Sequence, residues 1–164
     1  MLRKKESKEY FQSAVFGFND ALVSTTGVIV GVSTGTSDRR VVILAGIVTI
    51  LVEALSMGAG QYLSLKSAEE YEGRRGIRIP VLSGAVMFVS YFLAGLVPLI
   101  PIILLPIEYA RNAAIVAALV GLLILGIVKA KVSKASIVRS ALEVLIIGGL
   151  ATAIGIIAGN IFKV

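Results

Sequence analysis

The stretch LVEALSMGAGQYLS, residues 51–64, lies within a long hydrophobic run and carries one acid, Glu53. The run covers residues 41–65, which is enough for a helix to cross a bilayer, since a span needs about 20 apolar residues. A charged side chain at the centre of a span costs about 2.5 kcal/mol or more on insertion scales. The stretch therefore predicts a membrane-spanning helix in which Glu53 has either a function or a polar partner.

Four further hydrophobic runs accompany this one along the chain of 164 residues. The five predicted spans cover residues 11–33, 41–65, 80–105, 112–128 and 140–162, and short connections join them. Hydrophobic residues make up 57% of the sequence, whereas about 45–50% is typical of soluble domains. The sequence predicts an all-α integral membrane protein, with a single transmembrane domain over residues 1–164 that folds as a five-helix bundle.

The basic residues are distributed unevenly between the two sides of this bundle. Twelve of the 16 lie before the first span or in the connections that follow the second and fourth spans. The other side has only Arg39, Arg40, Arg111 and Lys163. Basic residues are enriched on the cytoplasmic side of membrane proteins, which predicts a cytoplasmic N terminus and an external C terminus. Topology thus explains the net charge of +6, and we expect no nucleic-acid partner.

The chain contains no cysteine, histidine or tryptophan. This excludes disulfides and metal sites built from thiolate or imidazole ligands. Metal or proton chemistry must then use carboxylates, methionine sulfur, hydroxyls, amides or backbone carbonyls. We expect neither an enzyme nor a permanently bound cofactor.

Two acids, Asp20 and Glu53, lie deep in the predicted spans. With a helical rise of about 1.5 Å per residue, Asp20 and Met57 each lie roughly 12 Å from the cytoplasmic end of their span, and Glu53 lies about 6 Å deeper. Thr49, Glu53, Met57 and Gln61 recur every four residues and share one face of the second helix. If the first two helices face each other, carboxylates, an amide and a thioether converge.

Such a set of ligands indicates a divalent-cation site, with the soft sulfur favouring a transition metal over Mg²⁺ or Ca²⁺. Two alternatives stay open at this point. Met57 fits a purely structural role as core packing. The acids, if protonated, fit hydrogen bonds between helices, which would make the chain a membrane anchor or assembly module that transports nothing. The connections between the spans are too short to hold a partner-binding domain, which argues against that module.

Small residues form stripes at helical spacing in two other spans. Stripes of this kind let helices approach closely. They comprise Gly27, Gly31 and Gly35 in the first span, and Ala151, Gly155 and Gly159 in the fifth. Gly58 and Gly60 in the second span predict a further close approach.

Three acids, Glu69, Glu70 and Glu72, follow the second span on the predicted cytoplasmic side. They are candidates for concentrating cations at the mouth of a path. They also fit a solvated helix end that pairs with Arg74 and Arg75.

Three segments of the chain resemble the vacuolar iron transporter family: GFNDALVSTTGVIVGVS at 17–33, LVEALSMGAGQYLSLKSAEEYE at 51–72 and LVPLIP at 96–101. The resemblance implies five transmembrane helices, a homodimer, and export of Fe²⁺ or Mn²⁺ from the cytosol in exchange for protons. It also implies that Asp20, with its neighbour Asn19, and Met57 line a translocation path at a dimer interface formed by the first two helices. The glycines from Gly27 onward would be the close-packing stripe there.

The chain departs from the better-described plant members of that family at two positions and in one connection. Those members have a glutamate where this chain has Thr49, and they tend to have one where it has Gln61. They also carry a cytoplasmic metal-binding domain between the second and third spans, whereas this chain has a short connection there. Glu53 can replace the displaced glutamate only if its face of the helix points at the path. The expected location is the cell membrane of a prokaryote, or otherwise a vacuolar membrane.

Overall fold

Five long helices form the chain, which is seen here as a computed structural model that describes residues 2–73 and 76–163. They are α1 (Leu2–Gly35), α2 (Arg39–Tyr71), α3 (Arg78–Leu104), α4 (Ile107–Ser133) and α5 (Ile137–Ile161). Each is long and apolar enough to cross a membrane. The prediction of five membrane-spanning helices is confirmed.

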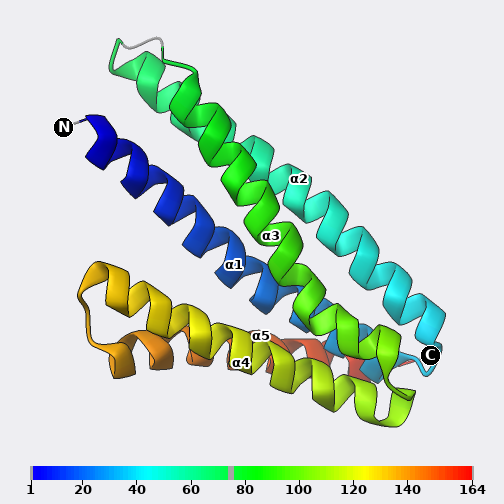
Figure 1. Ribbon diagram of the computed structural model, residues 1–164. Coiled ribbons are helices and arrows are strands. Elements are labelled where there is room, and N and C mark those ends of the chain that lie inside the picture. The colour runs from blue at the N-terminus through cyan, green and yellow to red at the C-terminus, as the bar shows by residue number, and fades with distance from the viewer. Residues whose placement is uncertain (1, 74–75, 164) are drawn as a thin grey trace.

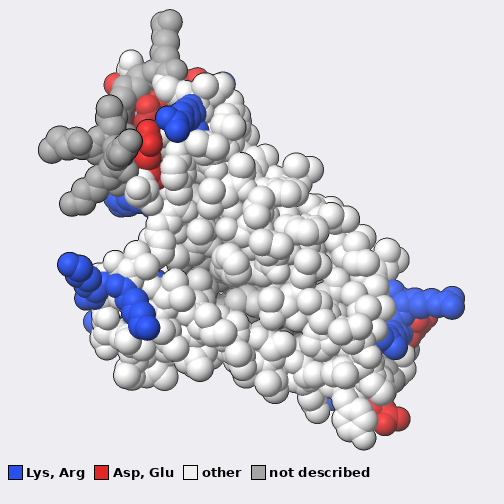
Figure 2. Space-filling view, viewed as in Figure 1, with Lys and Arg blue, Asp and Glu red and all other residues white. Residues whose placement is uncertain are grey.

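The helices form two pairs with α1 between them (Figure 1). α2 packs along α3, α4 packs along α5, and α1 contacts both pairs. The two termini lie at opposite ends of the bundle (Figure 1), as an odd number of antiparallel helices requires. Charged side chains gather at the two ends, with an uncharged band between them (Figure 2). This band is the part of the surface that fits a bilayer core.

Two helices extend well past their apolar runs. α1 begins nine residues before the predicted start at residue 11, and α2 continues to Tyr71. In the extension of α2, Lys66 lies one turn before Glu70, with 3.8 Å between the ammonium and carboxylate groups. Polar residues at this spacing support a helix in water, so the hydrophobic run marks the span but not the helix ends.

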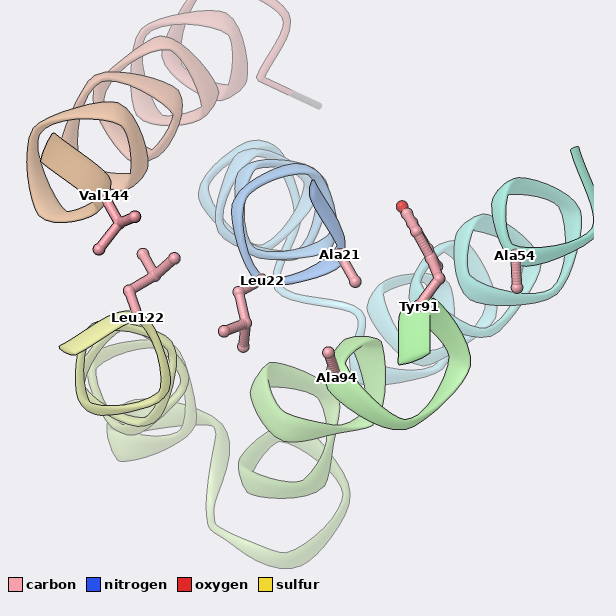
Figure 3. Close-up of a cluster of buried hydrophobic side chains, with 7 residues drawn as sticks. All are labelled: Ala21, Leu22, Ala54, Tyr91, Ala94, Leu122 and Val144. Carbon is pink, nitrogen blue, oxygen red and sulfur yellow. The ribbon is translucent and has the colours of Figure 1, made fainter. Parts of the chain in front are cut away.

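Side chains from all five helices meet in one core cluster (Figure 3). Its buried members are Ala21, Leu22, Ala54, Tyr91, Ala94, Leu122 and Val144. Leu22 of α1 points toward α4, while the side chain of Tyr91 extends from α3 with its oxygen between α1 and α2 (Figure 3). Small alanines on three of the helices leave room for that phenol ring.

The two small-residue stripes of α1 and α5 pack against each other. A Cβ atom built on Gly31 would lie 3.0 Å from the carbonyl oxygen of Gly155, and one on Gly35 would lie 3.3 Å from that of Gly159. Gly27 approaches Ala151 in the same way. The stripe of α1 thus serves a contact within the chain.

The glycines of α2 differ from each other in their surroundings. A Cβ atom on Gly58 would lie 3.0 Å from the carbonyl oxygen of Gly84 in α3. Gly60, by contrast, has no atom of the described residues within 4 Å of such a position. Close approach of a helix at this point therefore depends on Gly58.

α3 runs without interruption through Pro98 and Pro101. Proline removes backbone donors, and the last carbonyls of any helix lack partners within it. Arg39, the first residue of α2, supplies donors at this end: its Nε donates to the carbonyl of Ile102 at 2.8 Å, and its Nη2 donates to that of Ile103. This arginine ties the start of α2 to the end of α3.

Candidate functional site

Glu53 accepts hydrogen bonds from two hydroxyl groups on neighbouring helices. Ser24 of α1 donates to its Oε2 at 3.1 Å, and the phenol of Tyr91 in α3 donates to the same oxygen. The two hydroxyl oxygens lie 2.5 Å apart. Three helices thus converge on one carboxylate, and both bonds are made to Oε2, so that Oε1 has no hydrogen bond within the described part of the chain.

Asp20 lies on α1 one turn before Ser24 and is partly buried. It is close enough to Glu53 for the two carboxylates to repel each other when both are ionised. Within residues 2–73 and 76–163, Asp20 makes no hydrogen bond or ion pair. The bundle therefore holds two neighbouring carboxylates, of which only Glu53 is tied to other helices.

Met57 is partly buried and packs against the core cluster one turn from Glu53. One turn further on, the Nε2 of Gln61 donates to the hydroxyl of Ser13 at 3.0 Å, and that hydroxyl donates to the carbonyl of Glu9 at 2.9 Å. α1 and α2 are thus joined at two levels, through Gln61 and through Glu53. The shared face predicted for α2 does point toward α1.

Asn19 occupies a different environment from Asp20. Its side chain lines a cleft between α1, α4 and α5, whereas Glu53 belongs to α2. The carbonyl oxygen of its amide is buried and has no hydrogen-bond partner among the described residues. The structure therefore does not bring Asn19 together with the two carboxylates.

The donor atoms that one chain offers to a metal are few. No group of three or more acidic, histidine or cysteine side chains that could hold a metal ion is found in the described part of the chain. Two carboxylates and one thioether sulfur are available from Asp20, Glu53 and Met57. Octahedral coordination, which is typical of Mn²⁺, takes six donor atoms, so these three side chains leave positions for water or further ligands.

The acids beyond the second span lie at the end of α2. Glu70 pairs with Lys66 across 3.8 Å, and both side chains are exposed. An exposed pair of this kind contributes about 0–1 kcal/mol to stability. Arg74 and Arg75, the partners expected from the sequence, lie outside the described residues. Glu69 and Glu72 complete this acidic end of the helix.

Neither hydroxyl residue that holds Glu53 was predicted from the sequence, and of the two, Ser24 and Tyr91, the sequence carried a signal for Tyr91. It is fully buried in the middle of α3, whereas tyrosines of membrane proteins are enriched at the two interfaces. A buried tyrosine usually finds a partner for its hydroxyl. Its position in mid-span was the available signal, because few other side chains at that depth can accept its hydrogen bond.

Five apolar helices enclosing a hydrogen-bonded carboxylate define a multi-pass membrane protein with an ionisable cluster inside its bundle. The chain belongs to the VIT family, whose sequence profile matches residues 11–79 and 73–160. This confirms the family resemblance seen in the sequence.

Relatives in plants and an archaeon match most of the chain. It is 30% identical over 159 residues to vacuolar iron transporter homolog 1 of Arabidopsis thaliana, with 89% of this chain and 80% of the relative covered. It is 30% identical over 171 residues to vacuolar iron transporter homolog 5 of Oryza sativa subsp. japonica, covering 94% and 81%. An uncharacterized protein of Methanocaldococcus jannaschii is 28% identical over 160 residues, covering 85% and 83%.

Proposed function

We propose that this protein transports Fe²⁺ or Mn²⁺ out of the cytosol, in exchange for protons and as a homodimer. The observation that carries the proposal is the pair of neighbouring carboxylates inside the apolar bundle, Asp20 and Glu53. Ionisable groups within membrane spans usually mark ion or proton paths. Relatives named as vacuolar iron transporter homologs support a divalent metal as the transported substrate.

Each residue of the cluster has a distinct part in this proposal. Asp20 and Glu53 bind the metal through carboxylate oxygens, with Oε1 of Glu53 facing the ion while Ser24 and Tyr91 hold Oε2. The sulfur of Met57 lies one turn away on the same face and favours a transition metal. Protons and metal compete for the same oxygens, because a carboxylate must be deprotonated to bind a metal. Proton binding from the opposite side then releases the ion.

A second copy of the chain supplies further metal ligands. Two copies related by an axis beside α1 would bring four carboxylates and two thioethers around one path. An apolar groove of about 650 Å³ runs along α1 from Ser24 toward the C-terminal end of α5, and it leaves this side of α1 open to a partner. The groove supports an interface next to the cluster.

Asp20 is the residue that separates transport from the alternative function, a membrane assembly module. The hydrogen bonds of Glu53 fit either function, since a structural carboxylate would also be tied to neighbouring helices. Asp20 makes no such bond within the described part of the chain, and a buried acid without a partner is costly. A structural role does not explain why it is there.

The transport test uses purified protein in liposomes with an imposed pH gradient and an internal metal-sensitive dye. We expect metal influx that follows the gradient and that falls to the level of protein-free liposomes in Asp20→Asn. Asp38→Asn is the matched control: Asp38 is the exposed N-cap of α2, and asparagine caps a helix as well as aspartate does. Transport by Asp20→Asn at the parent rate would refute the proposal.

A further inference from the structure

A second cleft lies at the end of the bundle that carries most of the basic residues. It separates the first half of α1 from the adjoining ends of α4 and α5, and its volume is about 670 Å³. Figure 2 shows the hollow on the left, above a group of basic side chains. α1 and α5 touch through their glycines at the other end of the bundle and diverge here. The cleft is therefore a wedge that opens toward this membrane surface.

The walls and the mouth of the wedge differ in chemistry. Its walls are apolar, and they are formed by Phe11, Val15, Phe16, Val144 and Ile147. Its mouth carries two ammonium groups from different helices, those of Lys8 and Lys129.

One carboxylate, that of Glu143, also lines the wedge, but it is already engaged. Lys129 and Arg139 each lie 3.3 Å from it, through different oxygens. The mouth thus keeps a net positive charge, which disfavours a cation. The uncharged polar residues that line the cleft are Gln12 and Asn19 of α1 and Ser133 of α4.

The wedge is too small to enclose a transmembrane helix. A helix about 10 Å wide, side chains included, fills roughly 420 Å³ per turn, so the cleft has room for fewer than two turns. Lys8 and Lys129 each lie just outside an apolar run, where we expect the lipid headgroups. Apolar walls below a basic mouth match an amphiphile that has an anionic head and a hydrocarbon chain.

We propose that an anionic phospholipid of the adjacent leaflet binds in this wedge, with its phosphate at Lys8 and Lys129 and an acyl chain along the apolar walls. The lipid fills the space between α1 and the α4–α5 pair. This site uses neither Asp20 nor Glu53 and is independent of metal transport.

The test uses the absence of tryptophan from the chain. Phe16→Trp places one fluorophore in the wedge, and lipids with brominated chains quench it on contact. We expect brominated phosphatidylglycerol to quench this reporter at concentrations lower than brominated phosphatidylcholine requires. A basic side chain beside an anionic headgroup strengthens binding by about fivefold, so two give about twenty-fivefold. Phe88→Trp, in an apolar groove between α2 and α3, is the control and should show no preference.

Two matched double variants separate the site from general surface charge. Lys8→Gln with Lys129→Gln should abolish the preference at Phe16→Trp, whereas Lys131→Gln with Lys134→Gln should retain it. Equal quenching by the two lipids, or equal loss in both double variants, would overturn the proposal. Inorganic phosphate, compared with chloride at equal ionic strength, should leave the preference intact. Its loss in phosphate would show a simple anion site and would overturn the lipid assignment.

Discussion

Replacing Tyr91 by phenylalanine removes one of the two hydroxyl groups that hold Glu53 and keeps the buried ring. A hydrogen bond to a charged group contributes about 1.5–3 kcal/mol in soluble proteins, while side-chain couplings within membrane bundles average about 0.6 and reach about 1.7 kcal/mol. Tyr91 is fully buried, but Ser24 still donates to the carboxylate in the variant. We therefore expect Tyr91→Phe to lower the free energy of unfolding by about 1–2 kcal/mol.

A double-mutant cycle assigns this loss to the carboxylate. Glu53→Met keeps the length of the side chain and removes its oxygens, so Tyr91→Phe should cost less than about 0.5 kcal/mol in that background. The measurement is reversible unfolding in mixed detergent micelles. Tyr109→Phe, at an exposed tyrosine, is the control and should change stability by no more than about 0.5 kcal/mol. An equal loss from Tyr91→Phe with and without Glu53 would refute the bond as its cause.

Two further substitutions test the contacts that hold the helices together, and both are measured by the same unfolding assay. A Cβ atom on Gly155 would overlap the carbonyl of Gly27, so Gly155→Ala should lower stability by about 1–3 kcal/mol. A Cβ atom on Gly149 would meet no atom of the described residues within 4 Å, so Gly149→Ala should raise stability by up to about 1 kcal/mol. Equal effects of the two would contradict close packing of α1 on α5. Arg39→Gln should lower the free energy of unfolding by about 1–3 kcal/mol, because carbonyls at the end of α3 lose their donor. Arg40→Gln, at the exposed neighbouring residue, is the control and should change it by no more than about 0.5 kcal/mol. An unchanged stability of Arg39→Gln would show that its hydrogen bonds to α3 add nothing.

Hydrophobicity alone predicted the five helices, because each span must satisfy its backbone hydrogen bonds within itself. Their ends could not be read from it: α2 continues past residue 65 through a polar segment that is a good helix former in water. The arrangement of the helices was also outside the reach of the sequence. Both small-residue stripes were visible as packing faces, but nothing in them specified that Gly31 would meet Gly155.

The candidate site was also predictable only in part, because the sequence does not specify how the helices pack against each other. A period of four residues put Glu53, Met57 and Gln61 on one face, and the structure places that face toward α1. Tyr91 lies 38 residues from Glu53 along the chain, and only the packing of α3 against α1 and α2 brings its hydroxyl to the carboxylate. Asn19 was predicted to line the same path as Asp20, but the structure separates the two residues. Asp20 lies near Glu53, whereas Asn19 lines the wedge.

The central claim is that the intramembrane carboxylates bind a divalent transition metal, and thermal unfolding of the purified protein with and without Mn²⁺ tests it directly. A ligand at 100 times its Kd stabilises the native state by about 2.7 kcal/mol, so the parent should melt at a higher temperature with Mn²⁺. Glu53→Gln should lose this shift, while Glu108→Gln, at an exposed acid in the first turn of α4, should keep it. A Mn²⁺-dependent shift of full size in Glu53→Gln would contradict the claim.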